Sequence, residues 1–413
     1  MKIGGIRTGP GTFGTRFAAT VVWEDANRPP VEIWWDVGEE LAGEARPDPN
    51  AFVAAAFAPA LRHRERRIAV EGAVCPLLAD GLEAVGGVIR SWHPATGPLP
   101  RIEPSGGRQA PTPRVPPASA GYLTGGVDSL HLFYSNREDF PAAHPARFSH
   151  ALWIRGLDYP GMEESPWAVS QYARLELPLR EIAADIGVRL APITTNLRRL
   201  DDDLAFFAHR YLGGALLSGA HLLARRFSTV ALGSSWPGEH LVPWGSHPLL
   251  DPSYGSAALT IRHEALGLRR LDKLARLRGR TTALERLVSC SDAPAGAFVN
   301  CGRCTKCVRT LVEMEASGTL AHARSFPPVR VTADTIRGLE FDHGTEYFWR
   351  TLVAPLRSLG RDDLASAIER KIRATIRHRR RVEGLGWTGA IRRFDRNVLG
   401  GRLKKIYRRV AGT

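Results

Sequence analysis

The chain has 413 residues, of which 44% are hydrophobic and 24% are charged, an ordinary globular composition that argues against wholesale disorder. At roughly 150 residues per domain, this length predicts two to three domains. The longest apolar stretches, residues 51–61 and 211–223, are shorter than the ~18–20 residues that span a bilayer. The first ten residues are rich in glycine and lack the apolar core of a secretory signal. These features argue against a fibrous, disulfide-rich secreted or membrane-spanning protein, and we expect a cytoplasmic one.

Positive charge is concentrated near the C-terminus. The whole chain holds 56 Lys and Arg against 42 Asp and Glu, a net charge of +14. Residues 361–413 alone hold 16 basic and 5 acidic residues, so most of the excess belongs to this tail. Such a stretch can contact a nucleic acid, an acidic protein or an anionic membrane surface, or it is simply a solvated helical face.

Residues 1–92 indicate a small α+β domain. Three runs rich in Val, Ile or Trp predict strands, which we expect at residues 18–24, 31–37 and 67–70. Asp48 and Asn50 stand before an apolar run and predict the start of a helix there. The apolar spacing in residues 76–92 predicts a second helix.

Eight prolines between residues 93 and 117 argue against regular structure and predict an extended linker. Residues 118–325 then alternate between strand-like and helix-like runs, which predicts an α/β fold with a doubly wound parallel sheet. The strands are expected at residues 121–123, 151–154, 188–193 and 229–232, and the helices from residue 128, at 169–186 and at 211–225. Ligands in such folds bind beyond the carboxyl ends of the strands. A mostly helical basic extension is expected over residues 326–413.

A glycine-rich turn follows the first of these strands and consists of Thr124, Gly125, Gly126, Val127, Asp128 and Ser129. Two adjacent glycines let the backbone approach a ligand, and the N-terminus of the next helix presents N–H groups that suit a phosphate or pyrophosphate. Thr124 and Ser129 add hydroxyl groups, and Asp128 is placed to orient the backbone or to help hold Mg²⁺. A plain strand–turn–helix junction, capped by Asp128 or Ser129, explains these residues equally well.

Four of the five cysteines lie within 18 residues, at positions Cys290, Cys301, Cys304 and Cys307. Four thiolates at this spacing can close a tetrahedral site around Zn²⁺, with a structural role because no coordination position stays open. An iron–sulfur cluster needs the same ligands, and buried thiols without a metal are the third interpretation. Cys75 stands alone and is expected to be an ordinary buried thiol.

The two motifs together resemble those of one enzyme superfamily. Thr-Gly-Gly-Val-Asp-Ser at residues 124–129 is similar to the Ser-Gly-Gly-x-Asp-Ser signature of the PP-loop ATP pyrophosphatases, or adenine nucleotide α-hydrolase-like proteins, with threonine at the first serine. Leu-Val-Ser-Cys at 287–290, followed by Cys-Gly-Arg-Cys-Thr-Lys-Cys at 301–307, resembles the zinc site of the 7-cyano-7-deazaguanine synthase family within that superfamily. The resemblance covers about residues 118–325. It implies a Rossmann-like domain that binds ATP with Mg²⁺, and a structural Zn²⁺.

The resemblance also implies an AMP-forming ligase or amidotransferase. Such an enzyme adenylylates a carboxylate or amide-type oxygen, releases pyrophosphate, and lets ammonia, an amine or another nucleophile displace AMP. The backbone N–H groups of Gly125, Gly126 and Ser129 would stabilise the departing pyrophosphate with Mg²⁺. Two alternatives stay open: a tRNA thiolation enzyme with an iron–sulfur or sulfur-carrying cysteine cluster, and a non-catalytic nucleotide-binding protein.

The segment between the motifs supplies candidate substrate residues, namely Ser235, Trp236, Trp244, Ser246, His247 and Asp251. These side chains can stack on a planar ring and hydrogen-bond its edge, as for a small-molecule or modified-base substrate, or they form an ordinary packed loop.

By analogy with the superfamily, Lys273 would neutralise charge on the α-phosphate or pyrophosphate, although a solvated lysine is the common case. Arg155 and Gly156 would contact adenine or ribose by the same analogy, and a bland loop explains them equally well. His150 is expected to be structural. The tail would hold an acidic partner or nucleic acid, and a homodimer is compatible with this interpretation.

Overall fold

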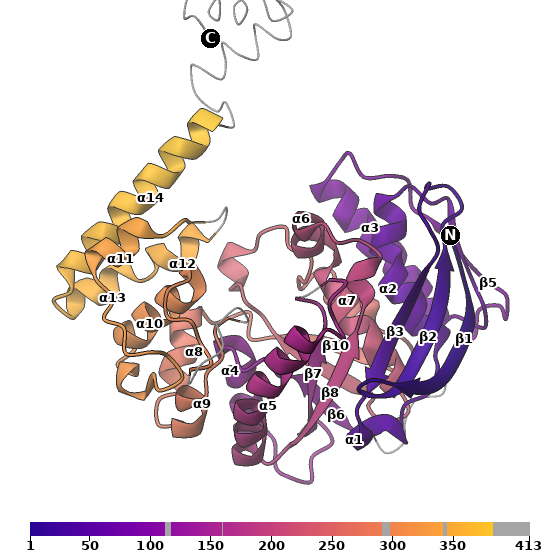
Figure 1. Cartoon of the computed structure of the whole chain (residues 1–413), viewed down its shortest axis with the longest axis horizontal. Coiled ribbons are helices and arrows are strands. Elements are labelled where there is room, and N and C mark those ends of the chain that lie inside the picture. Colours follow the sequence, from indigo (N-terminus) through magenta and orange to yellow (C-terminus); the bar gives the residue numbers. More distant parts are fainter. Residues whose placement is uncertain (112–116, 159, 291–297, 342–344, 383–413) are drawn as a thin grey trace, which may run out of the picture. The chain divides into compact units, whose positions relative to one another are not determined.

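The computed structural model describes the chain except residues 112–116, 159, 291–297, 342–344 and 383–413, and except the side chains of residues 379–382 (Figure 1). The chain forms two compact units. The first comprises Met1–Cys301 and Ala321–Pro327, and the second comprises Gly302–Leu320 and Pro328–Thr413. Among the described residues, no helix combines the length and the apolar character that a membrane crossing requires.

One ten-stranded sheet runs through the first unit in the order β10-β9-β6-β7-β8-β3-β2-β1-β4-β5 (Figure 1). Its strands are β1 (Lys2–Gly11), β2 (Gly14–Val22), β3 (Val31–Val37), β4 (Arg67–Val70), β5 (Arg101–Pro104), β6 (Ser119–Tyr122), β7 (Phe148–Arg155), β8 (Arg189–Thr195), β9 (Thr229–Gly233) and β10 (Thr260–Glu264). Only the pairs β8–β3, β3–β2 and β2–β1 of the described sheet are antiparallel. The expected α/β class, with a large and mostly parallel sheet, is therefore confirmed, and it is compatible with a Rossmann-like fold.

The sheet is continuous from the expected N-terminal domain into the expected nucleotide-binding domain, because β3 pairs with β8. Side chains reinforce this junction. The Trp34 N–H donates to Asn196 Oδ1 at 2.8 Å, and the Thr195 hydroxyl donates to the Trp34 carbonyl at 2.7 Å. The expectation that residues 93–117 lack regular structure is wrong at β5. Its last residue, Pro104, is tolerated because β5 is an edge strand, where a missing N–H costs little.

Helices cover both faces of the sheet. On one face, α2 (Pro49–Arg62), α3 (Pro76–Trp92) and α7 (Leu212–Leu217) pack around a large apolar core, and on the other lie α4 (Val127–Asp139) and α5 (Pro166–Ile186) (Figure 1). Asp48 caps α2 by accepting a hydrogen bond from the Asn50 N–H at 2.8 Å, as expected. The remaining helices of this unit are α1 (Glu39–Ala42), α6 (Leu204–Phe206), α8 (Arg270–Arg276) and α9 (Thr281–Glu285).

The helix expected at residues 211–225 is replaced by shorter pieces. A π turn over Phe207–Tyr211 leads into α7, which a 3-10 turn over Ser218–Leu223 follows. Glycines in this stretch pack unusually closely. A Cβ on Gly213 would lie 2.6 Å from Asp251 Oδ1, and one on Gly219 would lie 3.0 Å from Trp35 Nε1. Tertiary contacts that the apolar spacing does not encode therefore set the local geometry.

The order of the parallel strands reverses beside β6. The chain runs from β6 through α4 to β7 and through α5 to β8 on one side, and then crosses to β9 and β10 on the other side of β6. In open α/β sheets, ligands bind in the crevice outside the carboxyl ends of the strands at such a reversal. The residues that follow β6 and β9 are therefore the expected place for a ligand site.

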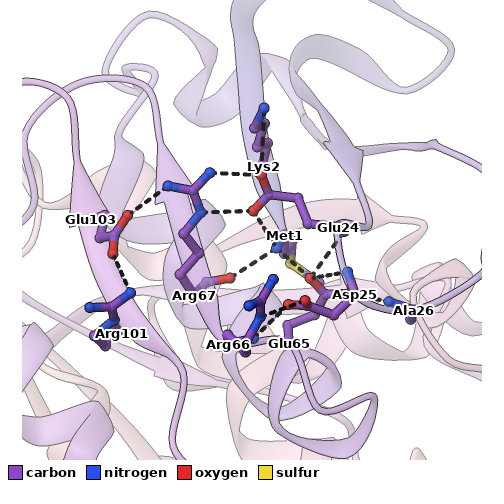
Figure 2. A network of polar contacts seen from close by, with 10 residues as sticks. All are labelled: Met1, Lys2, Glu24, Asp25, Ala26, Glu65, Arg66, Arg67, Arg101 and Glu103. Carbon is purple, nitrogen blue, oxygen red and sulfur yellow. Dashed lines mark hydrogen bonds and ion pairs between the residues drawn. The ribbon is translucent and has the colours of Figure 1, made fainter.

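A network of ion pairs connects β1 and β4 near the N-terminus of the chain (Figure 2). The Met1 amine donates to Glu65, to Glu24 at 3.1 Å and to the Arg67 carbonyl at 2.9 Å. Glu65 is fully buried and also accepts the Ala26 N–H at 2.9 Å. Burial raises the pKa of Glu65, but these donors outweigh it and hold the pKa below its usual value. The buried carboxylate is therefore charged and well satisfied.

The second unit is helical in its described part, as expected for the C-terminal extension. It contains α10 (Thr305–Ala316), α11 (Ala333–Gly338), α12 (Glu346–Arg350), α13 (Val353–Ser358) and α14 (Asp362–Val382). α14 buries Leu364, Ile368 and Ile372, whereas Arg373 and Arg377 are exposed on it. The rest of the expected basic tail, including residues 402–409, lies outside the described residues.

Candidate functional site

A cavity of about 300 Å³ opens at the carboxyl ends of β6 and β9, at the reversal in strand order. This volume is at the low end of the roughly 300–1,000 Å³ of ligand pockets. Most of its wall is apolar and includes Leu152, Leu212 and Trp236. A few polar side chains converge on it, which is the usual composition of a small-molecule site.

Two sequence segments about 110 residues apart meet in this cavity. Thr124, Gly126, Asp128 and Ser129 of the predicted phosphate loop line it, together with Ser235, Trp236, Trp244, Ser246 and His247 of the predicted substrate segment. The structure therefore brings most of the predicted site residues to one place. Of the predicted set, six residues are not among those that line the cavity: Gly125, Val127, Arg155, Gly156, Asp251 and Lys273.

The two glycines of the loop have different roles. Gly125 has φ +74°, and a Cβ there would lie 2.8 Å from Val288 Cγ2 and 2.9 Å from Leu179 Cδ2, so only glycine fits. Gly126 precedes α4 with φ −78°. A Cβ on Gly126 would have its nearest described neighbours, Thr124 Oγ1 and Val288 O, at the ordinary contact distances of 3.5 and 3.6 Å.

The Ser129 hydroxyl closes the turn. It donates to the Gly126 carbonyl at 3.0 Å and accepts from the Thr124 N–H at 3.2 Å. The hydroxyl thereby holds the loop in shape, while the first N–H groups of α4, which have no partner within the helix, stay directed at the space before its N-terminus. An anion at this turn would be bound mainly by the backbone.

Two cations from α8 clamp Asp128. Lys273 Nζ lies 2.9 Å from Asp128 Oδ1, and Arg270 donates to Oδ2 at 3.0 Å. The Lys273 ammonium also donates to the carbonyl of Ser234, which follows β9. Lys273 is only 1% exposed, so the alternative of a solvated lysine is wrong.

Lys273 and Arg270 thus place two positive charges next to Asp128, while Asp158 adds a second carboxylate to the cavity wall. Burial, followed by the charges of Lys273 and Arg276, lowers the pKa of His131, on the same helix as Asp128, to about 4. A positive field next to the N-terminus of a helix favours an anionic ligand.

Asp251 lies behind the cavity wall and organises two residues that line it. It is fully buried, and its Oδ2 accepts hydrogen bonds from Ser246 Oγ at 2.8 Å and from His263 Nδ1 at 2.7 Å. His263 was not predicted, because it lies on β10, a strand that was itself not predicted. The alternation in residues 260–264 (Thr-Ile-Arg-His-Glu) is the signal that would have indicated this strand.

The second set of unpredicted lining residues is apolar and comes from the irregular helical stretch between β8 and β9, for example Phe207 and Leu216. Tyr122, the last residue of β6, also lines the cavity. Burial and the charge of Asp251 raise the pKa of its hydroxyl far above the usual value, so the group is a neutral donor.

Arg155 is held away from the cavity by packing. Its guanidinium donates to Thr194 Oγ1 at 2.9 Å and lies over the rings of Phe13, Trp153 and Tyr172 at 4.9–5.2 Å. Gly156 has φ +94°, and a Cβ there would approach the Thr195 carbonyl to 2.0 Å, so it serves the backbone turn.

His150 is fully buried near the start of β7, at the end of the strand remote from this site. Burial, followed by Arg189 and Arg226, lowers its pKa to about 4. Neutral His150 is therefore a packing residue, in agreement with its expected structural role. Cys75 is likewise fully buried, as expected.

The sulfur atoms of Cys290, Cys301, Cys304 and Cys307 all lie within 4.8 Å of one another. Around a tetrahedral Zn²⁺ with Zn–S bonds of about 2.3 Å, the sulfurs stand about 3.8 Å apart, so the cluster needs only a small contraction. The Cys301 N–H donates to Cys290 Sγ and the Cys307 N–H donates to Cys304 Sγ, both at 3.4 Å. These contacts stabilise thiolates, and the four cysteines can therefore hold a metal such as zinc.

Comparisons with protein-family models, with curated proteins and with solved structures found no match to this chain.

Proposed function

We propose that this protein is an AMP-forming, ATP pyrophosphatase-type enzyme that adenylylates a carboxylate or amide-type oxygen and passes the activated group to ammonia, an amine or another nucleophile. One observation carries the proposal. The loop that resembles a PP-loop and the aromatic segment after β9 line a single cavity at the point where the strand order reverses. The resemblance supplies the reaction class, and the cavity supplies a place for both reactants.

In the proposed reaction, the substrate oxygen attacks the α-phosphorus of ATP. A P–O bond forms, and the bond to the β-phosphate oxygen breaks with its electron pair, so that pyrophosphate leaves. The backbone N–H groups of Gly126 and the first turn of α4 would bind that pyrophosphate, with Mg²⁺ neutralising part of its charge. Lys273 and Arg270, oriented by Asp128, would stabilise the charge that develops nearby.

The apolar wall of the cavity would protect the proposed intermediate from water. A mixed anhydride with AMP is open to hydrolysis, and water must be kept from it until the nucleophile arrives. The side chains of Trp236 and Trp244 offer flat surfaces on which a planar substrate ring could stack.

We propose that the four cysteines hold Zn²⁺ in a structural role. Four thiolates fill the tetrahedral positions and leave none for substrate, so the metal would supply conformational stability alone. One zinc per chain, measured by elemental analysis of purified protein, is expected. Iron with inorganic sulfide would instead favour the tRNA thiolation alternative. In that case, the exposed arginines of α14 would bind the RNA phosphates.

The test uses ATP labelled at the α-phosphate, incubated with the protein and fractions of a metabolite extract. Substrate-dependent formation of labelled AMP with pyrophosphate is expected. Labelled ADP without AMP would contradict the mechanism, and ATP binding without any turnover would favour a non-catalytic nucleotide-binding protein.

A matched pair of glycine variants locates the phosphate site. Gly126→Ala adds a methyl group where the described residues leave room, so the fold tolerates it while the approach of phosphate to the loop is narrowed. Gly87→Ala adds the same methyl group on α3, with no described atom within 4 Å of it. We expect calorimetry to show pyrophosphate binding at least ten-fold weaker in Gly126→Ala and unchanged in Gly87→Ala. Equal affinity in both variants would place the phosphates elsewhere.

A further inference from the structure

Two polar groups at the cavity have no role in the proposed adenylylation. The side chain of His263 is 5% exposed, and its Nε2 has no hydrogen-bond partner among the described residues. The buried Tyr122 hydroxyl likewise has none among them. Both residues line the cavity, whose wall is otherwise largely apolar. A buried polar atom without a partner is costly, and such atoms in a cavity are commonly satisfied by a ligand or by water.

The hydrogen bond to Asp251 determines which nitrogen of His263 carries the proton. Asp251 Oδ2 lies 2.7 Å from Nδ1 and can only accept, so Nδ1 must donate. In the neutral ring, Nε2 then bears a lone pair. Ser246 donates to the same carboxylate oxygen, and the Asp251 carboxylate is fully buried, so the ring is held in one orientation.

We propose that His263 is the proton acceptor for the nucleophile that enters this cavity, with Asp251 as the residue that positions it. The inference rests on the proposed function and adds to it the residue that activates an ammonia or amine nucleophile. A carboxylate that holds an imidazole by Nδ1 and leaves Nε2 facing a ligand is the arrangement that general-base histidines require.

The nitrogen lone pair of the amine attacks the activated carbon, and a C–N bond forms. The C–O bond to AMP breaks, and its electron pair leaves with the phosphate oxygen. The proton lost from the attacking nitrogen passes to His263 Nε2, and the resulting imidazolium, stabilised by Asp251, later releases it to water.

The charged and titratable groups around His263 are consistent with this role. The Asp251 carboxylate is hydrogen-bonded to the His263 ring. The neutral hydroxyl of Tyr122, on β6, lies within the electrostatic influence of that carboxylate. Burial and then the neighbouring His263 lower the pKa of His247, which makes this second imidazole a weaker base. On β10 itself, Arg262 and Glu264 form an ion pair with each other at 2.6 Å.

The first experiment needs no substrate. In the full chain labelled with ¹⁵N at histidine, long-range ¹H–¹⁵N spectra identify His263 by the signal lost in His263→Gln. We expect a neutral ring protonated at Nδ1, and a shift toward the other tautomer in Asp251→Asn. A ring protonated at Nε2, or a tautomer that does not respond to Asp251→Asn, would overturn the proposal.

The second experiment measures proton transfer. In the labelled-ATP assay, the stimulation of AMP release by ammonium chloride should fall about 100-fold in His263→Gln, within the range of general-base catalysis. Added imidazole should restore part of it in His263→Ala, which a merely structural histidine would not allow. Stimulation that survives in His263→Gln would refute the role. If the wild-type protein forms no AMP at all, the reaction class itself is refuted, and this result is distinct from a failure of the His263 role alone.

Discussion

The ion pair between Asp128 and Lys273 allows a quantitative test of how the loop is held. Replacing Asp128 by alanine removes the carboxylate that lies 2.9 Å from Lys273 Nζ and 3.0 Å from Arg270. Lys273 is 1% exposed, and in this variant its amine would keep the Ser234 carbonyl but lose the Asp128 carboxylate. The penalty therefore comes chiefly from an uncompensated buried ammonium.

Removing one partner of a buried ion pair costs roughly 3–5 kcal/mol. Asp128 is 16% exposed and Arg270 11%, so water relieves part of that penalty. We expect Asp128→Ala to lower the free energy of unfolding by about 3 kcal/mol, at the low end of that range. Lys273→Met should cost less, because Asp128 keeps Arg270 as a partner.

The assay is urea unfolding followed by tryptophan fluorescence, with both single variants and the double variant Asp128→Ala/Lys273→Met. The double variant should be more stable than the sum of the single effects predicts, by about 1–3 kcal/mol, because it removes both charges. If Asp128→Ala costs less than about 1 kcal/mol, or if the two effects simply add, the buried pair does not hold the loop as described.

Three further predictions follow from the same geometry. Gly125→Ala should lower the free energy of unfolding by about 2 kcal/mol or more, measured by thermal unfolding. The backbone at Gly125 is left-handed, and an added methyl group would lie 2.8 Å from Val288. An unchanged stability would contradict the described turn. Cys304→Ser should lose bound zinc by elemental analysis and lower the melting temperature, whereas full zinc content in the variant would disprove its role as a ligand. His150, with a folded pKa of about 4 against 6.5 when unfolded, should be neutral by NMR at pH 5, and the stability that it contributes above pH 6.5 is lost as the pH falls toward 4. A titration midpoint near 6.5 would contradict its burial.

Local patterns in the sequence predicted many elements closely. The strand at residues 31–37, the strand at 67–70 and the helix at 76–92 were expected within the bounds that the structure shows. These segments combine a clear apolar period with strong boundary residues, and both signals are local. The Gly-rich β1 lacks such signals, and β10 has only a short alternation without strong boundary residues, so neither strand was predicted.

Burial of charged groups was harder to predict than secondary structure. Nothing in the residues around Lys273 distinguishes a solvated lysine from one that is 1% exposed, because its partner Asp128 lies 145 residues away. The same holds for Arg155, whose aromatic neighbours include Phe13 of the N-terminal region. Such partners meet only when the sheet has formed.

The amino-acid order alone was enough to indicate an α/β chain, a turn suited to phosphate and a cluster of metal-binding cysteines, since each of these depends on residues close together along the chain. Folding decided that β3 joins β8 in one sheet, that the strand order reverses at β6, and that the turn at residues 124–129 shares a cavity with Trp236 and His263. Strand neighbours are selected by the packing of side chains distant in sequence, and short-range periodicity holds no information about that selection.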